Sequence, residues 1–446
     1  MNPRYLAFII LKKFFKEKKF LNLIIRDTLS RYHMDPRDKA FATNLAYGVL
    51  RKWEYLNYLV ETINPRIEKD LKLILMLGSY QFVFLKTPPH AVVNETVEAS
   101  KSVSRKYAPV VNAVMRKIVQ RGKKIKIKAP TEEEKLSIEL SLPLWLVKKI
   151  SKDWKDQEIA EEVLQSLNTE LPIHLRVNSL KIKDRKELID YLKKENPKAS
   201  LKEGKLPHLI EAWKLRNPAR LQAYRNGLIT VQDASSQQVV LLLEPKPQEN
   251  IWDVASAPGG KATYIAELSR DRAKILATDI NPGRINLIKS NAGRLGLNSI
   301  ETKVVDASST EEVKYLPEFD KVLLDAPCSS LGTLPRHPEE KFLRTPSHIK
   351  KITHLQEKLI ENASKKVKPG GKLLYSVCTI TREETIDLIA NFLKYNSEFE
   401  AVKIEKNTTG KVLESAGESG PKFQFWFNLP PKGEGFFAVL LQRKIG

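Results

Sequence analysis

The spacing of apolar residues divides the chain into a helical first part and a C-terminal part in which strands and helices alternate. Over residues 1–120 apolar side chains recur every three or four positions, and breaks fall at Asp35-Pro36, Asn64-Pro65 and Pro88-Pro89. No alternation typical of a strand interrupts this spacing. We therefore expect residues 1–125 to form an all-helical domain.

A basic linker over residues 121–135 precedes a segment of mixed pattern. Residues 145–154 and 158–167 have helical spacing, whereas residues 173–177 and 228–231 have the composition of strands. This mixture predicts a small α+β domain over residues 136–245.

From residue 246 the pattern becomes strand, turn and helix in repetition. Short β-branched strands between longer helices are typical of a parallel, doubly wound sheet, so we expect an α/β domain over residues 246–446 that ends in an antiparallel hairpin. The expected strands are residues 251–255, 275–279, 302–306, 322–325 and 372–377, and the expected helices are residues 261–268, 282–295, 348–367 and 382–393.

The charge is strongly positive and unevenly distributed. The formal net charge is +22, and residues 1–130 alone carry 26 Lys and Arg against 10 Asp and Glu. An excess of this size favours a polyanionic partner, for which nucleic acid is the main candidate. The alternative is the Lys-rich, solvated surface of a heat-stable protein.

Composition excludes several classes of protein. Two cysteines, Cys328 and Cys378, are too few for a disulfide scaffold or a cysteine-rich zinc site, and we expect no bound metal. No apolar run reaches the ~18 residues that span a bilayer, and the basic N-terminus has the pattern of an amphipathic helix rather than a signal peptide. We expect a cytoplasmic monomer without a membrane partner.

Several strands of the α/β domain end in residues suited to binding a cofactor. Ligands bind at the carboxyl ends of such strands. Asp279 follows Gly260 by nineteen residues, the spacing of a carboxylate that accepts hydrogen bonds from ribose hydroxyls, and Asp306 is a candidate acceptor for an adenine amino group. The loop after the first strand contains Ala255, Ser256, Ala257, Pro258, Gly259, Gly260 and Lys261.

That loop matches neither of the two common phosphate-binding patterns, the Walker loop and Gly-x-Gly-x-x-Gly. An adenosine site without a pyrophosphate cradle indicates S-adenosylmethionine as the cofactor. The alternative is that the aspartates are ordinary turn formers and helix caps, but their order on successive strands favours the cofactor.

Both cysteines are expected at the same edge of the sheet. Cys328 follows the fourth strand and Asp325, and Cys378 ends the next strand. A free cysteine is usually a buried, small hydrophobic residue, but two at this edge predict a chemical role for at least one. Such a role exists in cytosine methylation, because a thiolate that adds to carbon 6 of cytosine makes carbon 5 reactive towards a methyl sulfonium.

The sequence from Thr381 to Glu384 matches a capping box, and the positive end of a helix there would lower the pKa of Cys378.

Specific motifs resemble the family of RNA cytosine-C5 methyltransferases, and within it the bacterial type that acts on 16S ribosomal RNA. They are Ala257-Pro-Gly-Gly-Lys261, Asp325-Ala-Pro-Cys-Ser329, Arg336-His-Pro-Glu-Glu-Lys-Phe-Leu-Arg344, Val231-Gln-Asp-Ala-Ser-Ser-Gln237 and, nearer the N-terminus, Asp38-Lys-Ala, Tyr47-Gly-Val-Leu-Arg51, Gly78-Ser-Tyr-Gln81, Pro89-His-Ala91 and Val111-Asn-Ala-Val-Met-Arg116. The N-terminal motifs resemble a NusB-like RNA-binding domain, so the likeness covers nearly the whole chain.

The resemblance implies a Rossmann-like class I methyltransferase domain and a role for each site residue. Cys378 would be the nucleophile, Cys328 would assist release of the product, and Asp325 would face the target base as well as border the cofactor. Residues 255–261 would wrap the methionine end of S-adenosylmethionine, while Asp279 would hold its ribose and Asp306 its adenine. Ribosomal RNA would be the partner, bound in part by the helical domain and by the loop around Arg336.

Some positions depart from the family pattern. The loop begins Ala255-Ser-Ala rather than Cys-Ala-Ala, Cys378 lies in Val-Cys-Thr rather than Thr-Cys-Ser, and Thr385 stands where Asn is usual. These changes affect the hydrogen bonding expected around Cys378.

Three alternatives are open at this stage. A transfer RNA methyltransferase would use the same mechanism, and a DNA cytosine methyltransferase would use Cys328 as its nucleophile. A non-catalytic RNA-binding or assembly protein would bind no cofactor.

Overall fold

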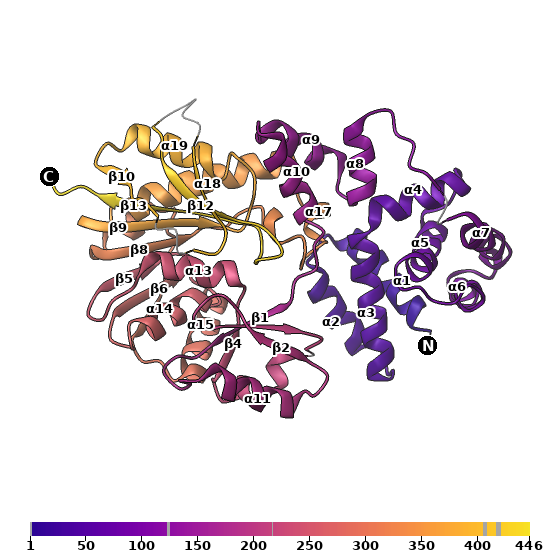
Figure 1. The fold of residues 1–446 in the computed structure, drawn as a ribbon, viewed down its shortest axis with the longest axis horizontal. Coiled ribbons are helices and arrows are strands. Elements are labelled where there is room, and N and C mark those ends of the chain that lie inside the picture. The colour runs from indigo at the N-terminus through magenta and orange to yellow at the C-terminus, as the bar shows by residue number, and fades with distance from the viewer. Residues whose placement is uncertain (1, 123–124, 216, 405–407, 416–420) are drawn as a thin grey trace. The chain divides into compact units, whose positions relative to one another are not determined.

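The computed structural model describes residues 2–122, 125–215, 217–404, 408–415 and 421–446, which form two compact units (Figure 1). The first unit contains residues 1–168 together with the short segment 336–344, and the second contains the rest of the chain. The polypeptide therefore leaves the second unit after Pro335, contributes nine residues to the first unit and returns at Thr345.

The described residues of the first unit form helices joined by loops, with no strand among them. Asp35 accepts a hydrogen bond from the backbone of Arg37 and so caps the helix that begins at Pro36, one of the predicted breaks. The helical pattern expected over residues 1–120 is confirmed. The helices are α1 (Pro3–Glu17), α2 (Leu21–Ser30), α3 (Pro36–Arg51), α4 (Trp53–Ile63), α5 (Lys69–Val83), α6 (Pro89–Val103), α7 (Ala108–Arg121), α8 (Glu132–Leu140), α9 (Leu144–Asp153), α10 (Gln157–Ser166) and α17 (Glu340–Leu343).

The second unit begins with a small antiparallel sheet in the order β2-β3-β1-β4. The strands expected at residues 173–177 and 228–231 are confirmed as β1 and β4. The first compact unit includes α8 to α10 together with the N-terminal helices. The domain boundaries expected near residues 125, 136 and 245 stay a prediction. The elements are β1 (Ile173–Val177), α11 (Arg185–Glu195), β2 (Ser200–Glu203), β3 (Leu209–Trp213), α12 (Gln222–Arg225), β4 (Ile229–Val231) and α13 (Ala234–Leu243).

The rest of the second unit is built on a mixed sheet with the strand order β11-β12-β13-β9-β8-β5-β6-β7. β5 to β9 are parallel and β13 is antiparallel to β9, so the expected doubly wound sheet and its closing hairpin are confirmed. The strands are β5 (Asn250–Asp253), β6 (Lys274–Asp279), β7 (Ile300–Val304), β8 (Phe319–Asp325), β9 (Val367–Val377), β10 (Phe399–Ala401), β11 (Lys411–Glu414), β12 (Gln424–Asn428) and β13 (Phe436–Arg443).

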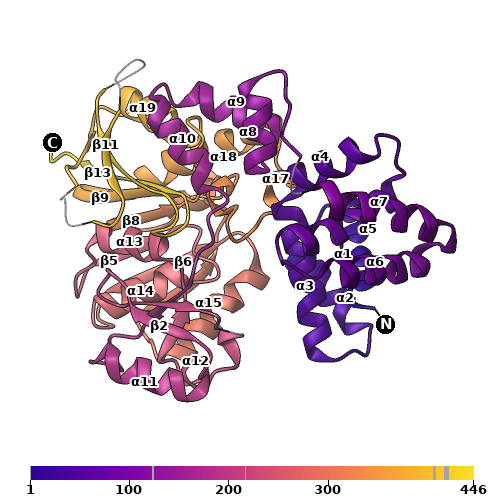
Figure 2. The same cartoon turned by 45° about the vertical axis from the view of Figure 1, so that its right-hand side comes forward.

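Helices cover both faces of this sheet, α18 and α19 on one side and α13, α14 and α15 on the other (Figures 1 and 2). They are α14 (Gly260–Leu268), α15 (Pro282–Leu295), α16 (Thr310–Lys314), α18 (Pro346–Ser364) and α19 (Ile386–Tyr395). β5 lies between β6 and β8. The chain first proceeds from β5 to β6 and β7 on one side and then crosses to β8 on the other side, and this reversal opens a crevice at the carboxyl ends of the strands. Among the described residues, no helix is both long and apolar enough to cross a bilayer.

The helix expected over residues 382–393 begins later than predicted. α19 starts at Ile386, and its N-cap residue Thr385 makes no capping hydrogen bond with its side chain. The predicted capping box at Thr381 is therefore wrong: the carboxylate of Glu384 accepts a hydrogen bond from Thr381 Oγ1 but points into the protein.

Candidate active site

A cavity of about 380 Å³ lies where β5, β6, β7, β8 and β9 end. It brings together most of the residues that the sequence singled out. The other predicted cofactor residues do not line it: Ser256, Pro258 and Gly259 lie in the loop between β5 and α14, and Gly260 and Lys261 begin α14. The predicted residues that line the cavity are Ala255, Ala257, Asp279, Asp306, Asp325, Cys328 and Cys378.

Two hydrogen bonds donated by Ser256 hold the loop after β5 against the sheet. Ser256 N donates to Thr278 O (2.8 Å), and Ser256 Oγ donates to the carboxylate of Asp253 (2.8 Å). Burial raises the pKa of Asp253 to about 7. Gly259 has φ of +93°, a conformation that favours glycine, and a Cβ there would lie in a tight contact 3.1 Å from Ile288 Cγ2.

Two aspartates border the cavity at the ends of β6 and β7. Asp279 is 3% exposed and accepts a hydrogen bond from Asn281 N, while Asp306 accepts from the backbone and the hydroxyl of Ser308. Ile280 provides an apolar wall beside them. Carboxylate acceptors next to an apolar surface fit an adenosine group, which needs partners for its hydroxyls and amino group and a surface for its ring.

Lys261 does not line the cavity but forms an ion pair with Asp325. Its Nζ donates to Asp325 Oδ2 (2.5 Å) and to Ser236 Oγ (2.9 Å), and Ser376 Oγ donates to the other oxygen of Asp325 (2.8 Å). Burial lowers the pKa of Lys261, but the charge and hydrogen bond of Asp325 outweigh burial and raise it above its ordinary value. Asp325 is thereby fixed with a protonated amine beside it.

The two cysteine sulfurs are 3.3 Å apart, close enough for a hydrogen bond. The parallel pairing of β8 with β9, in which Asp325 lies opposite Ser376, places the two following loops side by side. Gly332 N donates to Cys378 O (3.1 Å) and so ties the Cys328 loop to the end of β9. Both cysteines are free thiols and partly exposed, so a ligand in the cavity can reach both sulfurs.

The expectation of a lowered pKa for Cys378 is wrong. The hydrogen bond with Cys328 raises it well above the ordinary value for a thiol, and burial and the carboxylate of Asp325 act in the same direction. The error has two causes: the main one is the contact with Cys328, fifty residues away in the sequence, and the other is that α19 begins eight residues after Cys378, so no capping box forms.

A buried carboxylate that was expected to belong to a capping box instead holds the two cysteine loops together. Glu384 is fully buried and accepts hydrogen bonds from Ser329 N (2.7 Å), Ser329 Oγ (2.6 Å) and Thr381 Oγ1 (2.6 Å). Ser329 follows Cys328, and Thr381 lies three residues after Cys378. Glu384 therefore sets the distance between the loops that carry the two sulfurs.

A Cys328→Ala variant tests this reading of the cysteine pair. We expect the pKa of Cys378 to fall towards its ordinary value, because the hydrogen bond with Cys328, the main cause of its rise, is removed. A group with a raised pKa loses its proton only at higher pH, so at pH 8 the variant should contain more Cys378 thiolate. A fall of one unit would give about tenfold faster alkylation.

The measurement is the rate of iodoacetamide labelling of the Cys378 peptide against pH, followed by mass spectrometry. Equal or slower labelling of the variant at every pH would show that Cys328 does not hold the proton on Cys378.

Comparison with known proteins identifies the family. Residues 240–442 match the model of the 16S rRNA methyltransferases RsmB/F, residues 1–120 match the NusB family, and residues 142–220 match the ferredoxin-like domain of RsmF/B-like methyltransferases. The chain is 34% identical to a probable ribosomal RNA small subunit methyltransferase B from Synechocystis, over 91% of this chain and 92% of that protein.

The chain belongs to the RsmB/F methyltransferase family. The corresponding probable enzyme of Bacillus subtilis is 32% identical over 92% of both chains. The crystal structure of the protein PH0851 is similar over 99% of both chains, with 27% identity and a TM-score of 0.78. The resemblance inferred from the motifs is thus confirmed at the level of the family, including the NusB-like domain and the methyltransferase fold.

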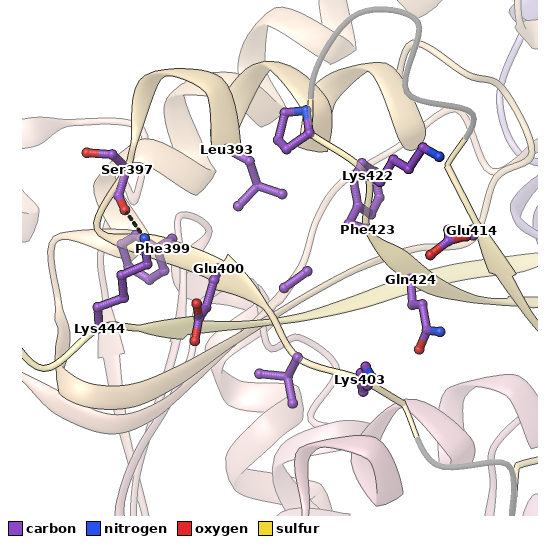
Figure 3. A pocket seen from close by; sticks show the side chains of 13 residues that line it. Leu393, Ser397, Phe399, Glu400, Lys403, Glu414, Lys422, Phe423, Gln424 and Lys444 are labelled. Carbon is purple, nitrogen blue, oxygen red and sulfur yellow. Dashed lines mark hydrogen bonds between the residues drawn. The ribbon is translucent and has the colours of Figure 1, made fainter.

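Another cavity of this RsmB/F-family chain differs in its chemistry. It lies beside β10 and β12, at the antiparallel end of the mixed sheet, and has a volume of about 440 Å³. Acidic, basic and apolar side chains line it, among them Glu400, Lys444 and Phe423 (Figure 3). Neither cysteine lines it, so the cavity at the carboxyl ends of the strands is the candidate active site.

Proposed function

We propose that this chain transfers a methyl group from S-adenosylmethionine to carbon 5 of a cytosine in 16S ribosomal RNA, with Cys378 as the covalent nucleophile. The observation that carries the proposal is the pair of cysteine sulfurs 3.3 Å apart in a cavity that Asp279, Asp306 and Asp325 also line. Family membership supports the methyl donor and the ribosomal substrate, since the relatives compared above are named small subunit rRNA methyltransferases.

The cofactor fits the part of the cavity bordered by the loop after β5 and by Asp279 and Asp306. When bound, S-adenosylmethionine supplies the methyl group as an electrophile. Asp279 would accept hydrogen bonds from the ribose, Asp306 would accept one from the adenine amino group, and Ala255 and Ala257, which line the cavity, would border the methionine end. The second half of the cavity, with Asp325 and both cysteines, is left for the base.

The reaction begins when Cys378 gives its proton to the carboxylate of Asp325 and its sulfur bonds to carbon 6 of the cytosine. The electron pair of the carbon 5–carbon 6 double bond moves towards ring N3, which takes up the thiol proton from Asp325 while the ammonium of Lys261 stabilises the carboxylate that is left. Carbon 5 is then nucleophilic and takes the methyl group. Cys328, acting as a thiolate, removes the proton from carbon 5. The bond from Cys378 to carbon 6 then breaks, its electron pair returns to the sulfur of Cys378, and ring N3 gives its proton back to Asp325.

A methylation assay tests the chemistry and the substrate together. The purified protein, tritiated S-adenosylmethionine and 16S rRNA are incubated, and the RNA is digested to nucleosides. We expect the label in 5-methylcytidine, with 23S rRNA and bulk transfer RNA as matched controls. Label in a ribose-methylated nucleoside would contradict carbon 5 as the acceptor, and label in transfer RNA alone would contradict ribosomal RNA.

A further inference from the structure

A basic and aromatic pocket lies within the first compact unit, which does not contain the cysteines. Its volume is about 510 Å³. One wall is the connection between α1 and α2, and the other is the segment 336–344 that the catalytic part of the chain contributes to this unit. The lining residues are Lys18, Lys19, Phe20, Leu23, Phe342, Leu343 and Arg344.

The wall formed by the segment 336–344 is firmly anchored. Phe342 packs edge-on against Phe15 and Trp53, with ring centroids 5.5 and 5.4 Å apart. Next to it, Lys341 is buried and its Nζ donates to Ser141 O (2.6 Å) and Arg51 O (3.2 Å). The pocket is therefore preformed on this side, which reduces the entropic cost of binding.

The opposite wall exposes apolar side chains among cations. Phe20 and Leu23 are 44% and 43% exposed, and both line the pocket. Residues 12–27 carry six Lys and Arg against two acidic residues. Lys19 and Arg344 at the rim have carboxylate neighbours, Glu17 at 3.1 Å and Glu340 at 2.6 Å, so the cationic character comes from the whole surrounding surface rather than from one side chain.

We propose that this pocket binds an unpaired nucleotide of the RNA substrate, with its base against Phe20 and its neighbouring phosphates near Lys18 and Lys19. An exposed aromatic ring surrounded by cations matches single-stranded nucleic acid, whose bases stack while its phosphates pair with Lys and Arg. The bases of a duplex are already stacked on each other, and a second copy of this basic surface would repel the first. This inference rests on the proposed function for the identity of the partner as RNA.

Equilibrium binding of a fluorescein-labelled twelve-nucleotide single-stranded RNA to the full-length protein tests the pocket, without S-adenosylmethionine. Phe20→Ala should raise the Kd about tenfold, since stacking on one aromatic ring contributes on the order of 1–3 kcal/mol per base. The matched control is Tyr315→Ala, which removes a ring that is 77% exposed outside both sites and should leave the Kd unchanged. A Lys18→Ala/Lys19→Ala variant should reduce the slope of log K against log salt by about 1.4, because each lost contact to a single strand contributes about 0.7.

An unchanged Kd for Phe20→Ala would overturn the proposal, and so would an equal loss of affinity for a hairpin RNA without unpaired bases. Because Phe20 is largely exposed, the variant should fold normally, and matching thermal unfolding curves verify this. Since no methyl donor is present, the result is separate from the chemistry: the pocket can be supported even if no 5-methylcytidine is formed, and methyl transfer can be supported even if Phe20 is irrelevant.

Discussion

Cys378→Ala should lose methyl transfer by about 10⁴-fold or more while keeping its affinity for S-adenosylmethionine. Carbon 5 of cytosine is not nucleophilic until a group has added to carbon 6, so no later step can compensate for the missing sulfur. The carboxylates proposed to hold the cofactor, Asp279 and Asp306, are unchanged in the variant. The rate of tritium transfer to 16S rRNA and a calorimetric titration with the cofactor measure the two parts of this expectation.

Cys328→Ala is the matched control, because it removes the neighbouring sulfur and leaves the proposed nucleophile in place. We expect this variant to form the bond to RNA but to release the product slowly, so that protein–RNA complexes accumulate. Full activity of Cys378→Ala would contradict the assignment. Loss of adduct formation in Cys328→Ala with retention in Cys378→Ala would instead support the DNA methyltransferase type of nucleophile.

Arg176→Met should lower the free energy of unfolding by about 3–5 kcal/mol, the range for removing one partner of a buried ion pair. Arg176 of β1 and Glu267 of α14 form an ion pair at 2.8 Å, and both side chains are 0% exposed. The guanidinium also donates to Gly260 O (2.6 Å) and Thr263 Oγ1 (3.0 Å), which ties the small sheet to the first turn after the cofactor loop. Methionine fills the volume but leaves Glu267 without its ion-pair partner, and burial already raises the pKa of that carboxyl.

Urea-induced unfolding followed by tryptophan fluorescence measures the change. The double variant Arg176→Met/Glu267→Leu is the control, and it should recover much of the lost stability because it removes the unpaired charge as well. A single variant as stable as the wild type, or a double variant less stable than the single one, would show that the ion pair does not hold these elements together.

The periodic parts of the fold could be predicted from the sequence because they repeat a local rule. The helix over residues 282–295 matches α15 at both ends, since Asn281 and Pro282 mark its start and Gly296 its end. The meeting of Asp279, Asp306 and Cys378 at one edge could also be predicted, because the carboxyl ends of parallel strands lie together whatever the side chains are.

Partners that are distant in sequence could not be predicted in the same way. The spacing from Thr381 to Glu384 matches a capping box. However, Glu384 accepts hydrogen bonds from Ser329, fifty-five residues earlier, and these tertiary contacts fix its position. The direction of the pKa shift of Cys378 depends on a sulfur fifty residues away. The segment 336–344 was identified as a motif, yet its incorporation into the helical unit follows from packing of Phe342 that no local pattern reveals.

The most direct measurement is to trap the bond between protein and base. 16S rRNA that contains 5-fluorocytidine is incubated with the wild-type protein and S-adenosylmethionine. Carbon 5 then has no removable proton, so the adduct cannot resolve. The predicted result is a denaturant-resistant protein–RNA complex whose digestion yields the nucleotide on the peptide with Cys378. A nucleotide attached to Cys328, or no complex while methyl transfer to unmodified RNA proceeds, would contradict Cys378 as the nucleophile.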